Sequence, residues 1–417
     1  MKNRIQAAAK TVWLIVICQS AAAVAQTYTA QNSPASPAQF KAIIQAAKAA
    51  HSVQLTPLVC LKPLPYGTTS ALPPAASADA DAGGPAITTF TVPGSISTFP
   101  AGYNFNFVPS NTSINSEGAI TGTYETKVPI TPTTFYVALH GFLRSPEGTF
   151  RLFDAPNAIA TLDSGTTPEA INENREITGS FQDVSFAFHG FFRAFDGRLT
   201  VFDIPGSAGT FPVGINSRGD VVGNYINPSS GSHGFMRSRD GGLTLFDPPG
   251  VGAFGCFPVG INSAGTITGT YFDSDYNEYG FLRYRNGTYI SFAITDPADG
   301  TSPTAIDESG RVTGYAYGPP PGFATHSFLR YADGTYTMFD PIGATSSIAL
   351  GINSQAAVIG TCDSSPYNYL RTANGLIQTV NLPGPVQGIN AAYEVPGFYY
   401  DSSSNTFIGY AAKLKCR

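Results

Sequence analysis

The dipeptide Ile-Asn recurs along the chain, and a glycine follows each copy at a constant distance. Its Asn occupies an anchor position that is filled, in order, by Asn115, Asn172, Asn216, Asn262, Asp307, Asn353 and Asn390. Seven residues after each anchor stand Gly122, Gly179, Gly223, Gly269, Gly314, Gly360 and Gly397. The anchors from Asn172 to Asn353 are 44, 46, 45 and 46 residues apart. A fixed period of this length, rich in glycine and aromatic residues, is typical of a radial array of small β-sheets.

Each repeat unit contains four segments with the character of β-strands. The first ends at the anchor, where Asn-Ser-x-Gly predicts a tight turn, and the second carries the glycine seven residues later. The third has the form His-Gly-Phe-Leu-Arg or a close variant, and the fourth ends near Phe-Asp-x-Pro. Asp-Gly often separates the third and fourth segments, which is a strong hairpin signal. Four antiparallel strands per unit are the composition of a propeller blade.

The two ends of the repeat array are incomplete in complementary ways. Residues 89–94 form a spare fourth strand that precedes the first anchor. After Asn390 the sequence supplies only a second strand, residues 395–400, and a third strand, residues 406–411. Pairing the spare strand with the last one would remove two exposed sheet edges. We therefore predict an all-β protein in which residues 87–417 form a seven-bladed β-propeller of four-stranded antiparallel blades, closed by an N-terminal strand.

Residues 1–25 have the parts of a secretory signal peptide. Lys2, Arg4 and Lys10 are basic, residues 11–17 are apolar, and Ala25 ends an Ala-x-Ala cleavage site. The apolar part is shorter than a membrane span, so we expect none after cleavage. A lipoprotein signal would use Cys18, but the large Ile17 precedes it where a small residue is needed. We expect a secreted, periplasmic or cell-surface protein.

Residues 26–86 separate the signal peptide from the repeats. Within them, Phe40, Ile43, Ile44 and Ala47 follow the spacing of one apolar helix face and predict a helix over residues 37–50. Residues 61–85 are rich in Pro, Ala and Ser, which is typical of a linker.

Charge excludes some partners. Without the three basic residues of the signal peptide, 20 of the 23 Lys and Arg remain against 28 Asp and Glu, a net charge of −8. This balance gives no electrostatic basis for binding nucleic acid. We expect a monomer.

Four cysteines remain in the exported chain: Cys60, Cys256, Cys362 and Cys416. They permit two disulfides in three pairings. A Cys60–Cys416 bond would tie the two ends of the ring, and unpaired buried thiols are the alternative.

Four of the five histidines begin the third strand of their unit, and an aspartate stands fourteen residues after each. The pairs are His140 and Asp154, His189 and Asp203, His233 and Asp247, and His326 and Asp340. Histidine beside a carboxylate can act as a general base. However, four copies in four separate units cannot share one active site. We interpret them as structural hydrogen bonds between the third and fourth strands, worth about 1–3 kcal/mol each.

One loop resembles a metal site. Asp273, Asp275 and Asn277 alternate as oxygen ligands do in calcium loops, but Glu278 and Tyr284 stand where an EF-hand needs glycine and glutamate. Calcium is thus one candidate ligand, a solvated acidic loop is the alternative, and no other cofactor is expected.

The loops after the second and fourth strands differ between units, and together they form what we name the long-loop rim. Variable loops on a rigid scaffold are where binding residues concentrate. Aromatic residues recur there, and exposed rings could stack on sugars or anchor a protein partner. Packing between blades is the alternative interpretation. The candidate rim residues are Tyr124, Tyr225, Tyr271, Tyr276, Phe323 and Tyr399.

The His-Gly-Phe-Leu-Arg strand, the Gly-Ile-Asn anchor and the signal peptide together resemble the bacterial extracellular HAF-repeat family. The likeness covers residues 87–417, although Gly or Ser replaces the Ala of the His-Ala-Phe triplet. It implies an exported protein and no particular reaction. We therefore predict a scaffold that binds a glycan or a surface protein. One alternative is a hydrolase or lyase acting on a polysaccharide, which would need acidic residues such as Asp183, Asp273, Asp275 or Asp363 to converge. A purely structural component of the cell envelope is the other alternative.

Overall fold

The computed structural model describes residues 84–100, 113–130, 135–159, 164–294, 300–317 and 324–415. The predicted signal peptide, the predicted helix over residues 37–50, nearly all of the linker, Cys60, Cys416 and Phe323 lie outside the described residues. The chain divides into two units, and every described strand belongs to the one made of residues 78–104 and 108–417. In the described part of the chain, no helix has the length and hydrophobicity needed to cross a membrane.

Six groups of four antiparallel strands follow one another in the described part of the chain. Unit 1 contains β2 (Ser97–Pro100), β3 (Ile120–Pro129), β4 (Phe135–Arg144) and β5 (Phe150–Phe153). Unit 2 contains β6 (Ser164–Ile171), β7 (Ile177–Gln182), β8 (Phe188–Arg193) and β9 (Leu199–Phe202). Unit 3 contains β10 (Gly209–Ile215), β11 (Val221–Asn227), β12 (Gly231–Arg237) and β13 (Leu243–Phe246).

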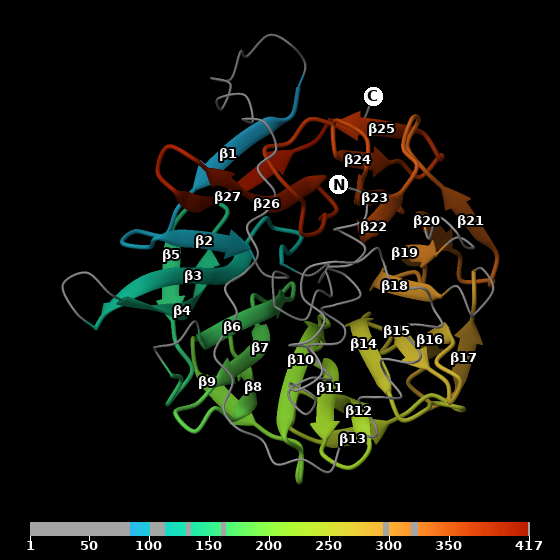
Figure 1. The fold of residues 1–417 in the computed structure, drawn as a ribbon, viewed down its shortest axis with the longest axis horizontal. Coiled ribbons are helices and arrows are strands. Elements are labelled where there is room, and N and C mark those ends of the chain that lie inside the picture. Colours follow the sequence, from blue (N-terminus) through green and yellow to red (C-terminus); the bar gives the residue numbers. More distant parts are fainter. Residues whose placement is uncertain are drawn as a thin grey trace, which may run out of the picture. The chain divides into compact units, whose positions relative to one another are not determined.

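The later units repeat this order. Unit 4 contains β14 (Cys256–Ile261), β15 (Ile267–Phe272), β16 (Glu278–Arg283) and β17 (Tyr289–Phe292). Unit 5 contains β18 (Thr301–Ile306), β19 (Val312–Tyr317), β20 (Thr325–Arg330) and β21 (Tyr336–Phe339). Unit 6 contains β22 (Ser347–Ile352), β23 (Val358–Cys362), β24 (Asn368–Arg371) and β25 (Ile377–Val380). Figure 1 shows the sheets side by side around a common centre, with the first strand of units 2 to 6 innermost.

The last sheet joins the two ends of the array. It contains β26 (Glu394–Asp401), β27 (Thr406–Lys413) and β1 (Ala86–Phe90), in the order β1-β27-β26. The spare N-terminal strand therefore pairs with the last strand, and Phe90 lies opposite Gly409. Where a first strand would lie, Val386 bridges Gly397.

The predicted bounds of the N-terminal strand were wrong. The strand ends at Phe90 rather than at residue 94. Pro93 has no N–H for a ladder, Gly94 has a φ of 83°, and the Ser95 N–H donates to the Val92 carbonyl at 3.0 Å. Residues 92–95 therefore form a turn that leads into β2.

The anchor side chains link each unit to the next. The Nδ2 of Asn172 donates to the backbone carbonyl of Asn216 at 2.9 Å, and Asn216 repeats this with Asn262 at 3.1 Å. Asn390 donates in the same way to Asn115 at 3.0 Å, so the last sheet is joined to unit 1 by the same bond. Equivalent bonds run from Asn115, Asn262 and Asn353 to the anchors that follow them.

The glycine seven residues after the anchor is required by a close approach between the first two strands. In unit 3, β10 has a bulge between Pro212 and Gly214, opposite Gly223 of β11. A Cβ on Gly223 would lie 2.2 Å from the Phe211 carbonyl oxygen. Any larger residue would therefore push the two strands apart.

Stacked side chains fill the space between neighbouring units. The phenylalanine that ends a fourth strand packs edge-on against a third-strand ring of the next unit, as Phe153 does on Phe191. The arginine that ends that third strand then covers the same phenylalanine, as Arg193 covers Phe153 at 4.8 Å. The last sheet meets unit 1 through the same arrangement, with Phe90 against Phe142 and Arg144.

We expect Asn262→Ala to lower the free energy of unfolding by about 2–4 kcal/mol, because it removes two buried hydrogen bonds and leaves the Thr266 N–H without a partner. Nδ2 of Asn262 donates to the Asp307 carbonyl at 3.1 Å, and its Oδ1 accepts from the Thr266 N–H at 3.0 Å. Chemical denaturation measures the loss. The exposed turn residue Asn286 is the matched control, and Asn286→Ala should cost less than about 1 kcal/mol. Equal losses in both variants would contradict the proposed role of the anchor.

Candidate functional site

The four histidines each lie against the aspartate fourteen residues later. The Nδ1 atoms of His140 and His189 are both 2.9 Å from an oxygen of their partners Asp154 and Asp203. For His233 and His326 the corresponding distances to Asp247 and Asp340 are 2.8 and 2.7 Å. The pairs are in four different units, and each joins a third strand to the residue after the fourth strand. This placement matches a structural role.

His189 differs from the other three because a second carboxylate contacts it. Its Nε2 lies 3.2 Å from Asp183 Oδ2, whereas His140 and His233 contact the hydroxyls of Thr126 and Ser230 with Nε2. Burial alone would lower the pKa of His189, but the hydrogen bonds and charges of Asp203 and Asp183 outweigh it and raise that pKa. Sequence reasoning missed this contact, because Asp183 lies in a loop that has no fixed register with the histidine.

Several predicted rim aromatics lie inside the sheets instead. Tyr124 and Tyr271 are buried, and Tyr124 stacks on His140 with ring centroids 5.0 Å apart. Tyr225 stacks on His233 at 5.3 Å, and burial raises the pKa values of both Tyr124 and Tyr225. The register explains these contacts, since Tyr124 lies directly opposite His140. Tyr124, Tyr225 and Tyr271 are therefore packed against neighbouring side chains, as the alternative interpretation proposed. Tyr276 and Tyr399 are half-buried.

The exposed apolar groups of the long-loop rim come from other residues. In the loop between β7 and β8, Val184 and Phe186 expose 74% and 53% of their surface. Phe186 has a φ of 65°, a conformation that disfavours side chains with a Cβ. Unit 1 adds Ile130 and Tyr136, which are also exposed. Sequence reasoning singled out neither Val184 nor Phe186.

The acidic loop residues do not converge. Asp183 Oδ1 accepts hydrogen bonds from Ser185 and from the Ala187 N–H, and chiefly the Ser185 hydroxyl lowers its pKa to about 2. Asp273 Oδ1 accepts in the same way from the N–H groups of Asp275 and Asn277. Each carboxylate thus holds its own turn. In the part of the chain that the structure describes, no three His, Cys, Asp or Glu side chains are grouped to hold a metal, and the calcium loop stays a prediction.

The described cysteines are free. Cys256 is buried, which raises the pKa of its thiol well above the usual value, and Cys362 is half-buried. They do not pair with each other.

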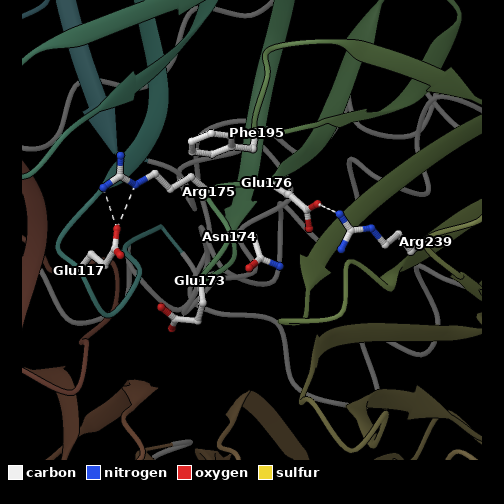
Figure 2. Close-up of a pocket in the computed structure, with 7 residues that line it drawn as sticks. All are labelled: Glu117, Glu173, Asn174, Arg175, Glu176, Phe195 and Arg239. Atoms are coloured by element: carbon white, nitrogen blue, oxygen red, sulfur yellow. Dashed lines mark hydrogen bonds and ion pairs between the residues drawn. The ribbon is translucent and has the colours of Figure 1, made fainter.

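A hollow of about 450 Å³ lies on the opposite side, among the short turns after the first and third strands, which we name the short-turn rim. Figure 2 shows the Phe195 ring near the Arg175 side chain, and it shows Arg239 paired with Glu176. Two ion pairs hold the wall: Arg175 Nη2 lies 2.7 Å from Glu117, and Arg239 Nη2 lies 2.7 Å from Glu176. The lining residues are Glu117, Glu173, Asn174, Arg175, Glu176, Phe195 and Arg239.

Comparison with known proteins shows the fold and no family. No family model and no curated protein matches the chain. Virginiamycin B lyase from Staphylococcus aureus is 13% identical, covers 79% of this chain and all of its own, and has a TM-score of 0.51. A prolyl endopeptidase is 10% identical over 78% of this chain and 51% of its own, also with a TM-score of 0.51. The β-propeller domain of the trilobed protease from Pyrococcus furiosus is 11% identical over 69% of this chain and 90% of its own, with a TM-score of 0.47. The described part of the chain is thus all-β, with the four-stranded sheets of a β-propeller.

We expect Asp203→Ala to lower the unfolding temperature, because the hydrogen bond to His189 contributes about 1–2 kcal/mol. Asp203→Asn keeps an acceptor for Nδ1 and should lose less. Differential scanning calorimetry at pH 6 compares the two variants with the parent protein. An unchanged unfolding temperature in Asp203→Ala would remove the structural interpretation.

The stability of the protein should depend on the protonation of His189. Its folded pKa is raised, so its contribution is complete below the unfolded value of about 6.5 and is lost as pH rises through the folded pKa. Asp183 has a folded pKa of about 2, so its contribution is present above pH 3.8 and is lost as pH falls. Thermal unfolding from pH 6 to 9 should show a decline that His189→Gln reduces. His233→Gln is the control, and it should keep the part of the decline that comes from His189. A parent-like slope in His189→Gln would contradict the prediction.

Proposed function

We propose that residues 86–415 form a closed seven-bladed propeller that is exported and binds a protein partner through its long-loop rim. The pairing of β1 with β27 and the bond from Asn390 to Asn115 support closure. The signal peptide and the HAF-repeat resemblance support export. No catalytic step is part of the proposal.

The loop between β7 and β8 is the main support for a binding surface on the long-loop rim. It presents Val184 and Phe186 to solvent, and Phe186 keeps its left-handed backbone at a cost of about 1–2 kcal/mol. Strained, exposed apolar residues in a loop typically serve a binding function rather than folding. Unit 1 contributes two further exposed apolar residues to the long-loop rim, Ile130 and Tyr136.

The composition of this surface favours a protein over a glycan. Val184 and Ile130 are aliphatic and offer no hydrogen bonds to hydroxyl groups, whereas apolar anchors with an aromatic residue are typical of protein interfaces. A polysaccharide hydrolase or lyase would need carboxylates free to act on substrate. Asp183, Asp273 and Asp363 instead accept hydrogen bonds from backbone N–H groups of nearby loop residues.

We expect a variant with Val184→Ser and Phe186→Asn to bind the surface of the producing cells at least tenfold more weakly than the parent protein. Asn tolerates the left-handed conformation, so the variant should fold with unchanged thermal stability. Flow cytometry with the fluorescently labelled mature protein measures saturable binding. Leu376→Ala, at an exposed position on the short-turn rim of unit 6, is the matched control and should bind like the parent.

Treatment of the cells identifies the class of partner. Protease treatment should abolish binding, and periodate oxidation of surface sugars should not. Loss of binding after periodate alone, or parent-like binding by the double variant, would overturn the proposal.

A further inference from the structure

The anchor turn of unit 2, which lines the hollow on the short-turn rim, has an arginine where four of the seven anchor turns have glycine. Gly118, Gly219, Gly265 and Gly310 occupy the third position after their anchors with φ between 79° and 87°. Arg175 occupies that position in unit 2 with a φ of 57°, and its guanidinium lies in the wall of the hollow. Ala356 and Tyr393 also replace the glycine, so the turn tolerates a Cβ at a cost of about 1–2 kcal/mol.

Four of the five charged side chains around the hollow form ion pairs, and Glu173 is the fifth. Arg175 pairs with Glu117 through Nε and Nη2, and Arg239 pairs with the buried Glu176. Glu173 accepts hydrogen bonds from the Ser116 N–H at 3.0 Å and from the Ser116 hydroxyl. A strongly charged ligand would have to disrupt these pairs, whereas a neutral ligand would not.

The remaining groups suit a ligand with hydroxyls and an apolar face. Phe195 exposes 61% of its surface at the edge of the hollow. Arg239 uses one nitrogen on Glu176, and a guanidinium has five N–H donors. Asn174 donates to the Ser217 carbonyl through Nδ2, which leaves its Oδ1 as an acceptor. A sugar ring both donates and accepts hydrogen bonds, and its C–H face packs on aromatic rings.

We propose that this hollow is a second binding site, for a neutral saccharide ring that packs on Phe195 and is hydrogen-bonded by Arg239, Asn174 and Glu173. The site is formed by turns of units 1, 2 and 3 on the short-turn rim. It is distinct from the long-loop rim, so either surface can be tested without the other.

The test uses the mature protein and the methyl glycosides of glucose, galactose, mannose and N-acetylglucosamine. Saturation-transfer NMR and isothermal titration measure binding. At least one neutral glycoside should bind, Phe195→Ala should weaken it tenfold or more, and Phe195→Tyr should retain it within about threefold because the ring face is preserved. Phe195 is exposed, so both variants should keep the unfolding temperature of the parent protein.

Two controls separate this site from its alternatives. Phe186→Asn, on the long-loop rim, should leave glycoside binding unchanged. Glucuronate and glucosamine probe charge, and glucuronate should bind more weakly than the neutral sugars because the Glu173 carboxylate would repel it. The proposal is overturned if none of the four glycosides binds, if Phe195→Ala binds like the parent, or if glucosamine alone binds.

Discussion

The anchor asparagine performs two tasks, and the arrangement of units depends on both. Its Oδ1 accepts N–H groups of the following turn, as Asn216 does from Arg218 and Asp220. Its Nδ2 donates to the backbone of the next unit. Asp307 separates the two tasks, because an aspartate keeps the acceptor and has no donor. It still holds its turn through the Ser309 and Arg311 N–H groups, while Arg311 and Thr304 reach unit 6 instead through the Ser354 and Ala349 carbonyls.

The second contact between units is apolar and lies farther from the centre. Phenylalanine at the end of a fourth strand fits over a glycine of its own third strand, as Phe246 does over Gly234. This places its ring against the next unit, where Arg283 covers it at 5.0 Å. The strand β1 brings the same phenylalanine, Phe90, to the last sheet. Completing that sheet therefore supplies the interface with unit 1 as well as a hydrogen-bonding partner for β27.

Features that could be compared between units were predictable, since each copy repeats the same physical requirement. The four strands, the anchor turn, the histidine and aspartate spacing and the N-terminal pairing all follow from comparing units. Features present in one copy were not. Asp183 contacts His189 only because the loop after β7 turns back on itself, and the hollow exists only where turns of three units meet. Arg175 was visible in the sequence as a departure from glycine, but its direction depends on the fold. The stacking of Tyr124 on His140 required the strand register.

The two rims are under different constraints. The short-turn rim carries the polar links between units, so most of its side chains are already committed, as the Glu173 carboxylate is to Ser116. The long-loop rim also has polar links between units, such as that of Thr325 to Ser346, but its loops differ in length and composition from unit to unit. A binding site on the short-turn rim must therefore be built from the residues that hold units together. A ligand there would contact units 1, 2 and 3 at once, and its binding energy would add to the cohesion of those units. Binding of a saccharide to the proposed site would therefore stabilise the folded protein. A partner on the long-loop rim would instead contact loops that take no part in the anchor hydrogen bonds.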